Sequence, residues 1–81
     1  MINAQVLPPK MALQLQERAL RGEADYEIES GGGRKIYEFY VGNYVNCLVG
    51  TNPPDGHVRK VSTEEMARLR EQARRWKDPR P

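Results

Sequence analysis

RKIYEFYVGNYVNCLV, residues 34–49, is the stretch that decides the fold of this 81-residue chain. Residues 34–41 and 44–49 are rich in β-branched, aromatic and other apolar side chains, which predicts two strands. Gly42-Asn43 between them is a two-residue hairpin signal with glycine in first place. Because both strands have apolar side chains on both faces, we expect this hairpin at the centre of a sheet or against a partner.

Further strands are predicted on either side of this hairpin. Residues 24–29 alternate strictly between apolar and acidic side chains, which indicates a half-buried strand, and residues 30–33 form a glycine-rich turn. On the other side, residues 50–56 are a loop rich in proline and glycine, and residues 57–61 are a short fourth strand.

Helices are predicted at both ends. A helix is predicted over residues 9–21, because residues 10–21 are strong helix formers, proline suits the first turn, and Gly22 is a natural C-cap. Ser62 and Glu65 make a capping box for a second helix that runs to about residue 77. Its apolar stripe at spacings of three and four consists of Met66, Leu69, Ala73 and Trp76. We therefore expect Trp76 to be buried against the sheet.

These elements predict a single small domain over residues 1–81, of class α+β and order α-β-β-β-(β)-α. The simplest arrangement is a small antiparallel sheet with the N- and C-terminal helices packed on one face. Residues 1–8 are expected to be an extended arm, and residues 78–81 a frayed tail.

Composition sets limits on the surroundings and partners. The net charge of +2 is uneven: residues 1–50 sum to −1 and residues 51–81 to +3, which is too weak a basic bias to indicate a dedicated nucleic-acid binder. Cys47 is the only cysteine, so an internal disulfide is excluded and a reducing, cytoplasmic location is expected. No apolar run approaches the ~20 residues of a membrane span, and the first residues lack the pattern of a signal peptide.

Catalytic and metal-binding motifs are not evident, and no cofactor is expected. Cys47 and His57 could form a nucleophile and base, but Cys47 lies in an apolar strand and His57 beside a turn, which favours a small core residue and a solvated imidazole. One cysteine and one histidine are too few for a metal site. Glu27, Glu29 and Glu38 could converge, although a solvated acidic face is the favoured interpretation.

The glycine-rich stretch at residues 30–35 is followed by two bases and could in principle hold a phosphate. It lacks the spacing of a phosphate-binding loop and leads into a strand, so a plain hairpin loop is favoured.

Two sets of residues are candidate binding surfaces. Ile36, Tyr40 and Tyr44 would form a protein interface if both helices covered the other face, because exposed tyrosines are typical interface anchors. The bases Arg70, Arg74 and Lys77 flank the apolar stripe of the second helix and form a candidate basic patch. A core role for the tyrosines and a solvated role for the bases remain open.

The leading hypothesis is a non-enzymatic interaction protein that binds and modulates a larger protein partner, with a homodimer as a possible state. Small inhibitors and adaptors encoded by phages and mobile elements, anti-CRISPR proteins among them, share this general character, although no motif ties the chain to them. The alternative is a nucleic-acid-binding accessory protein that uses the basic helix and the sheet tyrosines, with weak binding expected. A small enzyme subunit is the third hypothesis.

Overall fold

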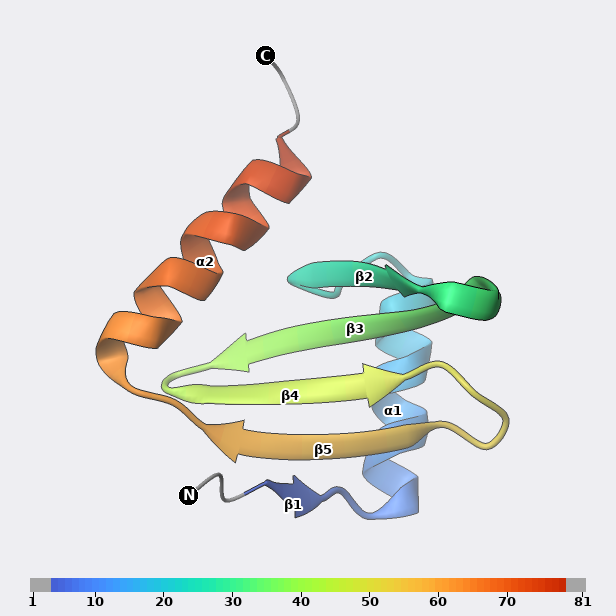
Figure 1. The fold of residues 1–81 in the computed structure, drawn as a ribbon. Coiled ribbons are helices and arrows are strands. Elements are labelled where there is room, and N and C mark those ends of the chain that lie inside the picture. The colour runs from blue at the N-terminus through green and yellow to red at the C-terminus, as the bar shows by residue number, and fades with distance from the viewer. Residues whose placement is uncertain (1–3, 79–81) are drawn as a thin grey trace.

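The fold, as given by a computed structural model that describes residues 4–78, is a five-stranded antiparallel sheet with one helix before and one after its long strands (Figure 1). In chain order the elements are β1 (Gln5–Val6), α1 (Pro9–Leu20), β2 (Tyr26–Ser30), a 3₁₀ turn (Gly31–Gly33), β3 (Arg34–Val41), β4 (Tyr44–Val49), β5 (Asp55–Lys60) and α2 (Thr63–Lys77). The spatial order of the strands is β1-β5-β4-β3-β2. The predicted α+β class is confirmed.

The central hairpin agrees with its prediction residue for residue. β3 and β4 pair from Ile36–Val49 to Val41–Tyr44, and Gly42 has the positive φ of +59° that a turn with glycine in first place requires. β2 begins two residues later than predicted, and β5 begins at Asp55 instead of residue 57.

The predicted N-terminal arm contains a strand that the sequence reasoning missed. Gln5 and Val6 pair with Val58 and His57 of β5, so β1 forms one edge of the sheet. The next residue, Leu7, is buried over Gly56, where an added Cβ would lie 3.0 Å from Leu7 Cδ1. A glycine in β5 therefore makes room for the chain to turn from β1 into α1.

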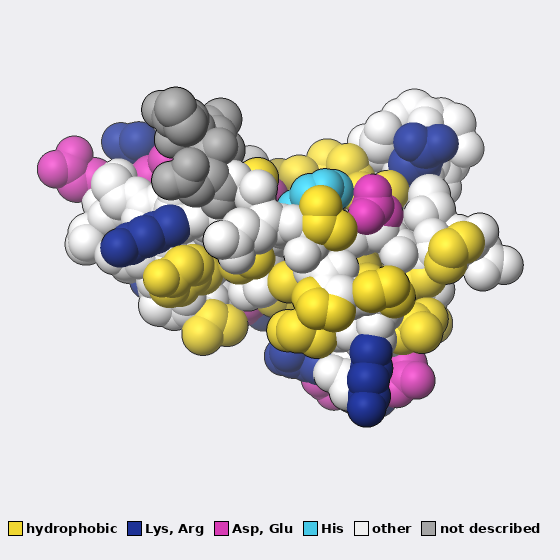
Figure 2. Space-filling view, turned by 90° about the horizontal axis from the view of Figure 1, so that it is seen from below, with side chains coloured by type: hydrophobic (Ala, Val, Ile, Leu, Met, Phe, Trp, Pro, Cys, Tyr) yellow, Lys and Arg dark blue, Asp and Glu magenta, His cyan; other side chains and the backbone are white. Residues whose placement is uncertain are grey.

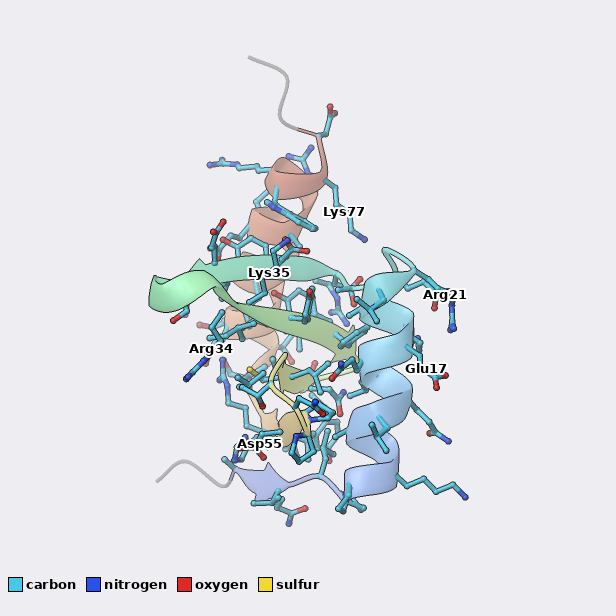
Figure 3. All side chains as sticks on the ribbon, turned by 90° about the vertical axis from the view of Figure 1, so that its right-hand side faces the viewer. Glu17, Arg21, Arg34, Lys35, Asp55 and Lys77 are labelled. Atoms are coloured by element: carbon cyan, nitrogen blue, oxygen red, sulfur yellow. The ribbon has the colours of Figure 1, made fainter. Side chains whose placement is uncertain are left out.

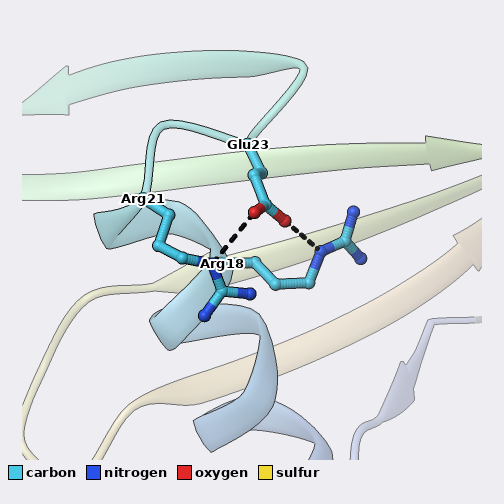
Figure 4. Close-up of polar contacts among 3 residues, drawn as sticks. All are labelled: Arg18, Arg21 and Glu23. Carbon is cyan, nitrogen blue, oxygen red and sulfur yellow. Dashed lines mark hydrogen bonds and ion pairs between the residues drawn. The ribbon is translucent and has the colours of Figure 1, made fainter.

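α1 ends in a Schellman motif, as the position of Gly22 predicts. Gly22 has a φ of +80°, its amide donates to Ala19, and the Glu23 amide donates to Arg18. The Glu23 carboxylate also accepts hydrogen bonds from Arg18 Nε at 3.1 Å and Arg21 Nε at 2.9 Å (Figure 4). This carboxylate therefore links both arginines at the helix end to the turn that follows.

The two helices pack on opposite faces of the sheet, which corrects the expectation that they share one. Phe39 and Tyr40 are neighbours on β3 and so point to opposite faces. Phe39 belongs to the cluster under α1, whereas Tyr40 packs against the cluster that contains Met66 of α2. The α1 cluster consists of Ala12, Ala19, Ala24, Phe39 and Leu48, with Leu15 and Tyr37 packed against it.

α2 begins with the predicted cap, since the Ser62 hydroxyl accepts a hydrogen bond from the Glu65 amide at 3.0 Å. Met66 and Val45 are fully buried where the first turns of α2 cross the end of the sheet. The helix then continues past β2, so its last turn has no strand beneath it (Figure 1). For this reason Trp76 is 41% exposed, and the prediction that it is buried is wrong.

Within residues 4–78, neither helix has the length and apolar character needed to cross a membrane. The predicted tail at residues 78–81 lies almost wholly outside the described part of the chain, as do the first three residues of the predicted arm.

Candidate protein-binding site

The face of the sheet opposite α1, called here the open face, presents a row of aliphatic side chains. Ile28 of β2 is the register partner of Ile36 on β3, and Ile36 is the partner of Val49 on β4. Directly paired residues on adjacent strands have Cβ atoms ~5 Å apart, so the three side chains form one continuous row. Ile28 is exposed, and Ile36 and Val49 are partly exposed.

α2 covers only one end of the open face. The buried cluster on this face consists of Val45, Val61 and Met66, with Tyr40 and Leu69 packed against it. All of the sheet residues in that cluster lie at the β3–β4 turn, whereas the aliphatic row lies at the opposite end of the same strands. The row therefore has no helix over it among residues 4–78.

A second row on the open face contains the polar and titratable side chains. Cys47 lies between Glu38 of β3 and His57 of β5, its register partners on either side. The sequence analysis raised this pair but did not favour it, because only the strand register brings the single cysteine and histidine together. His57 lies within β5 and is partly exposed, so its predicted place beside a turn is corrected.

The chemistry of this row does not activate the thiol. Burial raises the pKa of Cys47, and the negative charge of Glu38 raises it further, against a smaller lowering by Arg59. Cys47 therefore stays a protonated thiol at neutral pH. No three His, Cys, Asp or Glu side chains in the described part of the chain are placed to hold a metal ion.

Tyr40 is anchored on the open face and is not a free aromatic anchor. Its hydroxyl donates to Glu38 Oε1 at 2.5 Å, and its amide donates to Asp25 Oδ2 at 2.8 Å. Desolvation raises the pKa of its phenol far above the ordinary value, and the hydrogen bond to Glu38 adds to this shift. Tyr40 thus stays neutral and holds the Glu38 side chain in place.

The three residues predicted as a protein interface are divided between the two faces. Ile36 and Tyr40 share the open face, but Tyr40 packs against the α2 cluster. Tyr44 points to the α1 face, where it is 47% exposed beyond the helix. Only Ile36 therefore belongs to the aliphatic row.

The predicted basic patch is brought together but is locally neutralised. Arg70, Arg74 and Lys77 line one surface hollow with Asp25 and Tyr40. Arg70 donates to the Gly42 carbonyl at 2.8 Å, Arg74 pairs with Glu71, and Lys77 lies 3.8 Å from Asp25. The pairing of Arg74 and Lys77 with acids reduces the charge available to a polyanion.

The acidic side chains and the glycine turn give no further site. Glu27 and Glu29 lie on the α1 face and Glu38 lies on the open face, so the three do not converge. The turn at Gly31–Gly33 joins two strands directly and opens no helix of the length that anion binding uses.

Charged side chains lie on both sides of the sheet. Figure 3 shows Arg34 pointing to the side of the open face, and Glu17 and Arg21 pointing outward from α1. A view onto the β1 edge shows a further group of hydrophobic side chains over β1 and the start of α1 (Figure 2). Val6, Met11 and Leu13 are the exposed large apolar residues of this region.

A comparison with protein-family models, curated proteins and solved structures finds no match to this chain. Support for a function therefore comes from the geometry of these surfaces.

Proposed function

We propose that this chain is a non-enzymatic interaction protein that binds a larger protein partner through the open face of its sheet and modulates that partner. The observation that carries the proposal is the row of Ile28, Ile36 and Val49 across three strands, which neither helix of the described residues covers. Contiguous apolar surface of this kind marks protein interfaces more often than scattered exposed residues do.

The rest of the open face fits a protein partner better than a small-molecule substrate. Its polar row holds a protonated thiol, and Glu38 is engaged by the Tyr40 hydroxyl. These groups can give hydrogen-bonding specificity at the rim of an apolar interface. We propose that it acts as an inhibitor or adaptor in the reducing cytoplasm, of the kind that phages and mobile elements encode.

Nucleic acid remains the alternative partner. The hollow lined by Arg70, Arg74 and Lys77 supports it, and the ion pairs of Arg74 and Lys77 within the chain argue against it. We expect non-specific DNA binding no tighter than ~10⁻⁴–10⁻⁶ M at physiological salt. Nanomolar DNA binding that resists salt in a gel-shift assay would make nucleic acid the favoured partner over protein.

The test compares two matched variants in capture experiments from the native host. Val49→Glu places a charge in the aliphatic row, and Val41→Glu places the same charge on an exposed valine of the α1 face. We expect the unmodified chain and the Val41→Glu variant to retain one stoichiometric protein partner. We expect the Val49→Glu variant to lose this partner while its circular dichroism spectrum stays unchanged. Light scattering shows whether the partner is a second copy. Retention of the partner by Val49→Glu would contradict the proposal.

A further inference from the structure

We propose that the partner adds an extended segment to the outer edge of β2, with basic side chains opposite Glu27 and Glu29 and apolar side chains beside Ile28. This inference rests on the proposed function, because it specifies how the partner that covers the open face is held. It also names the chemistry of the partner: a strand in which basic and apolar residues alternate.

The sheet has two outer strands, and only β2 is long enough to act as a template. β2 has five residues and pairs only with β3 within the described part of the chain. β1, at the other edge, has two residues and is soon followed by Pro8 and Pro9, which have no backbone N–H to donate. Strand addition at β2 can therefore form a ladder that β1 cannot.

β2 alternates in chemistry as well as in direction. Tyr26, Ile28 and Ser30 point to the open face, whereas Glu27 and Glu29 point to the α1 face. An incoming strand with apolar residues on the open face would extend the row formed by Ile28, Ile36 and Val49. Its residues on the α1 face would lie beside the two carboxylates.

The negative charge of Glu27 and Glu29 on β2 is only partly balanced by basic side chains of the described residues. Lys35 is the register partner of Glu29, but its Nζ lies 3.2 Å from the Glu27 carboxylate, and Glu29 is exposed and forms no ion pair within 4 Å among residues 4–78. Opposite charges directly across a strand pair are favourable, so a lysine or arginine beside Glu29 would stabilise the added strand.

A second copy of this chain is a poor occupant of the same edge. A two-fold axis that pairs two β2 strands in antiparallel fashion is perpendicular to the sheet, so each face of one copy continues into the same face of the other. In the register that overlaps the two strands fully, Ile28 lies opposite Ile28, and Glu27 of each copy lies opposite Glu29 of the other. Like charges facing each other across strands are destabilising, so the edge discriminates against self-pairing and in favour of a basic strand.

The last turns of α2 project past β2 in two perpendicular views and lie next to the Tyr26 end of its outer edge (Figures 1 and 3). On the sheet side of α2, Trp76 contacts Tyr26 edge-on and leaves 41% of its surface exposed. Arg74 and Arg75 pair with Glu71, which limits their repulsion of a basic segment.

The test uses three capped peptides and the complete chain labelled with ¹⁵N. The probe is Thr-Lys-Val-Lys-Val-Lys-Thr, and the controls replace its lysines with glutamate or its central lysine with proline. We expect the probe to slow amide hydrogen exchange within residues 26–30 by at least ~10-fold at saturation, because exchange then requires the added strand to dissociate. The glutamate and proline peptides should leave these amides unchanged.

Charge variants test the role of the two carboxylates. We expect Glu27→Gln with Glu29→Gln to weaken probe binding about threefold to tenfold, since two cross-strand charge pairs are lost. The matched control removes two exposed charges elsewhere, Glu17→Gln with Glu64→Gln, and should change binding less than about twofold because screened charges at a distance contribute little.

Unchanged β2 amides at millimolar probe, or equal effects of the lysine and glutamate peptides, would overturn the inference. The two proposals fail separately. If Val49→Glu abolishes partner capture but the probe leaves β2 unchanged, the open face binds the partner without strand addition. If the probe protects β2 but Val49→Glu keeps the partner, the β2 edge binds strands and the proposed function is wrong.

Discussion

Trp76 meets Tyr26 edge-on, with ring centroids 5.7 Å apart and ring planes inclined at 73°. The Tyr26 hydroxyl also accepts a hydrogen bond from Gln72 Nε2 at 2.9 Å. These two contacts attach the second half of α2 to the outer strand of the sheet. Because the helix has passed the last strand at this point, the same contacts leave one side of the indole in solvent.

Replacement of Trp76 should therefore destabilise the fold only moderately. Removing a fully buried tryptophan side chain costs ~3–5 kcal/mol of unfolding free energy. Because the Trp76 indole is only half-buried, Trp76→Ala should lower the unfolding free energy by about 1–2 kcal/mol. Urea unfolding followed by circular dichroism measures this, since the variant has lost the only tryptophan. Tyr26→Phe is the control, because it keeps the ring contact and removes only the hydrogen bond to Gln72.

A loss above ~3 kcal/mol in Trp76→Ala would show that the indole is a core residue, as its place in the apolar stripe predicts. A loss of unfolding free energy near zero would instead show that Trp76 does not stabilise the fold and is free to contact a partner.

Local signals in the sequence predicted the elements, because caps and turns depend on residues close together in the chain. Gly22, the Gly42-Asn43 turn and the Ser62 cap all occur where their chemistry requires. β1 was missed because a two-residue strand has no periodicity of its own and is stabilised by its pairing with β5. Helix placement was also missed, since an apolar stripe shows that a helix packs but not on which face.

In the candidate site, too, local features were predicted from the sequence and the alignment of separate strands was not. The apolar pattern on both faces of β3 and β4 indicated a sheet surface left bare by two helices on one face, whereas the structure has one helix on each face and places Ile36 at the end of the open face that α2 does not cover. The actual row also needs Ile28 and Val49, which only the strand register brings beside Ile36. The register likewise places Cys47 next to His57, two residues ten positions apart in the sequence. No property of the separate segments specifies these alignments.

The Ser62 cap gives a second prediction of stability. Ser62→Ala removes the acceptor of the Glu65 amide and should lower the unfolding free energy by about 1 kcal/mol. Ser62→Asp keeps an acceptor at the same position and should restore most of the loss. Thermal and urea unfolding of the three proteins measure the effect, and equal stability of Ser62→Ala and the parent chain would show that solvent replaces the cap.

Glu23 should make stability depend on pH in the acid range. Hydrogen bonds from Arg21 and Arg18 lower its pKa in the folded chain below the ordinary value of 4.5. A lowered folded-state pKa stabilises the fold above pH 4.5, and this contribution is lost as pH falls through the folded-state value. The difference in unfolding free energy between the parent chain and Glu23→Gln should therefore be present at pH 7 and vanish in strong acid.

The control for this titration is Glu17→Gln, an exposed change on α1, the helix that ends just before Glu23. Its unfolding free energy should follow the pH dependence of the parent chain. If the unfolding free energy of Glu23→Gln also runs parallel to that of the parent chain from pH 7 to pH 2, the hydrogen bonds from Arg18 and Arg21 to Glu23 do not stabilise the fold.

The thiol of Cys47 should be a poor nucleophile, and its reactivity tests the electrostatics of the open face. Burial and the charge of Glu38 raise its pKa above the ordinary value of 9.0, so the reactive thiolate is scarcer than in an unfolded chain. Alkylation by iodoacetamide, followed by mass spectrometry at pH 8, should be slower in the native chain than in urea. Glu38→Gln removes the charge but can still accept from Tyr40, so it should raise the native rate while the rate in urea stays unchanged. Native alkylation that is faster than in urea would show a lowered pKa, and His57, directly across the strand pair, would then be the first residue to test as the base that activates Cys47.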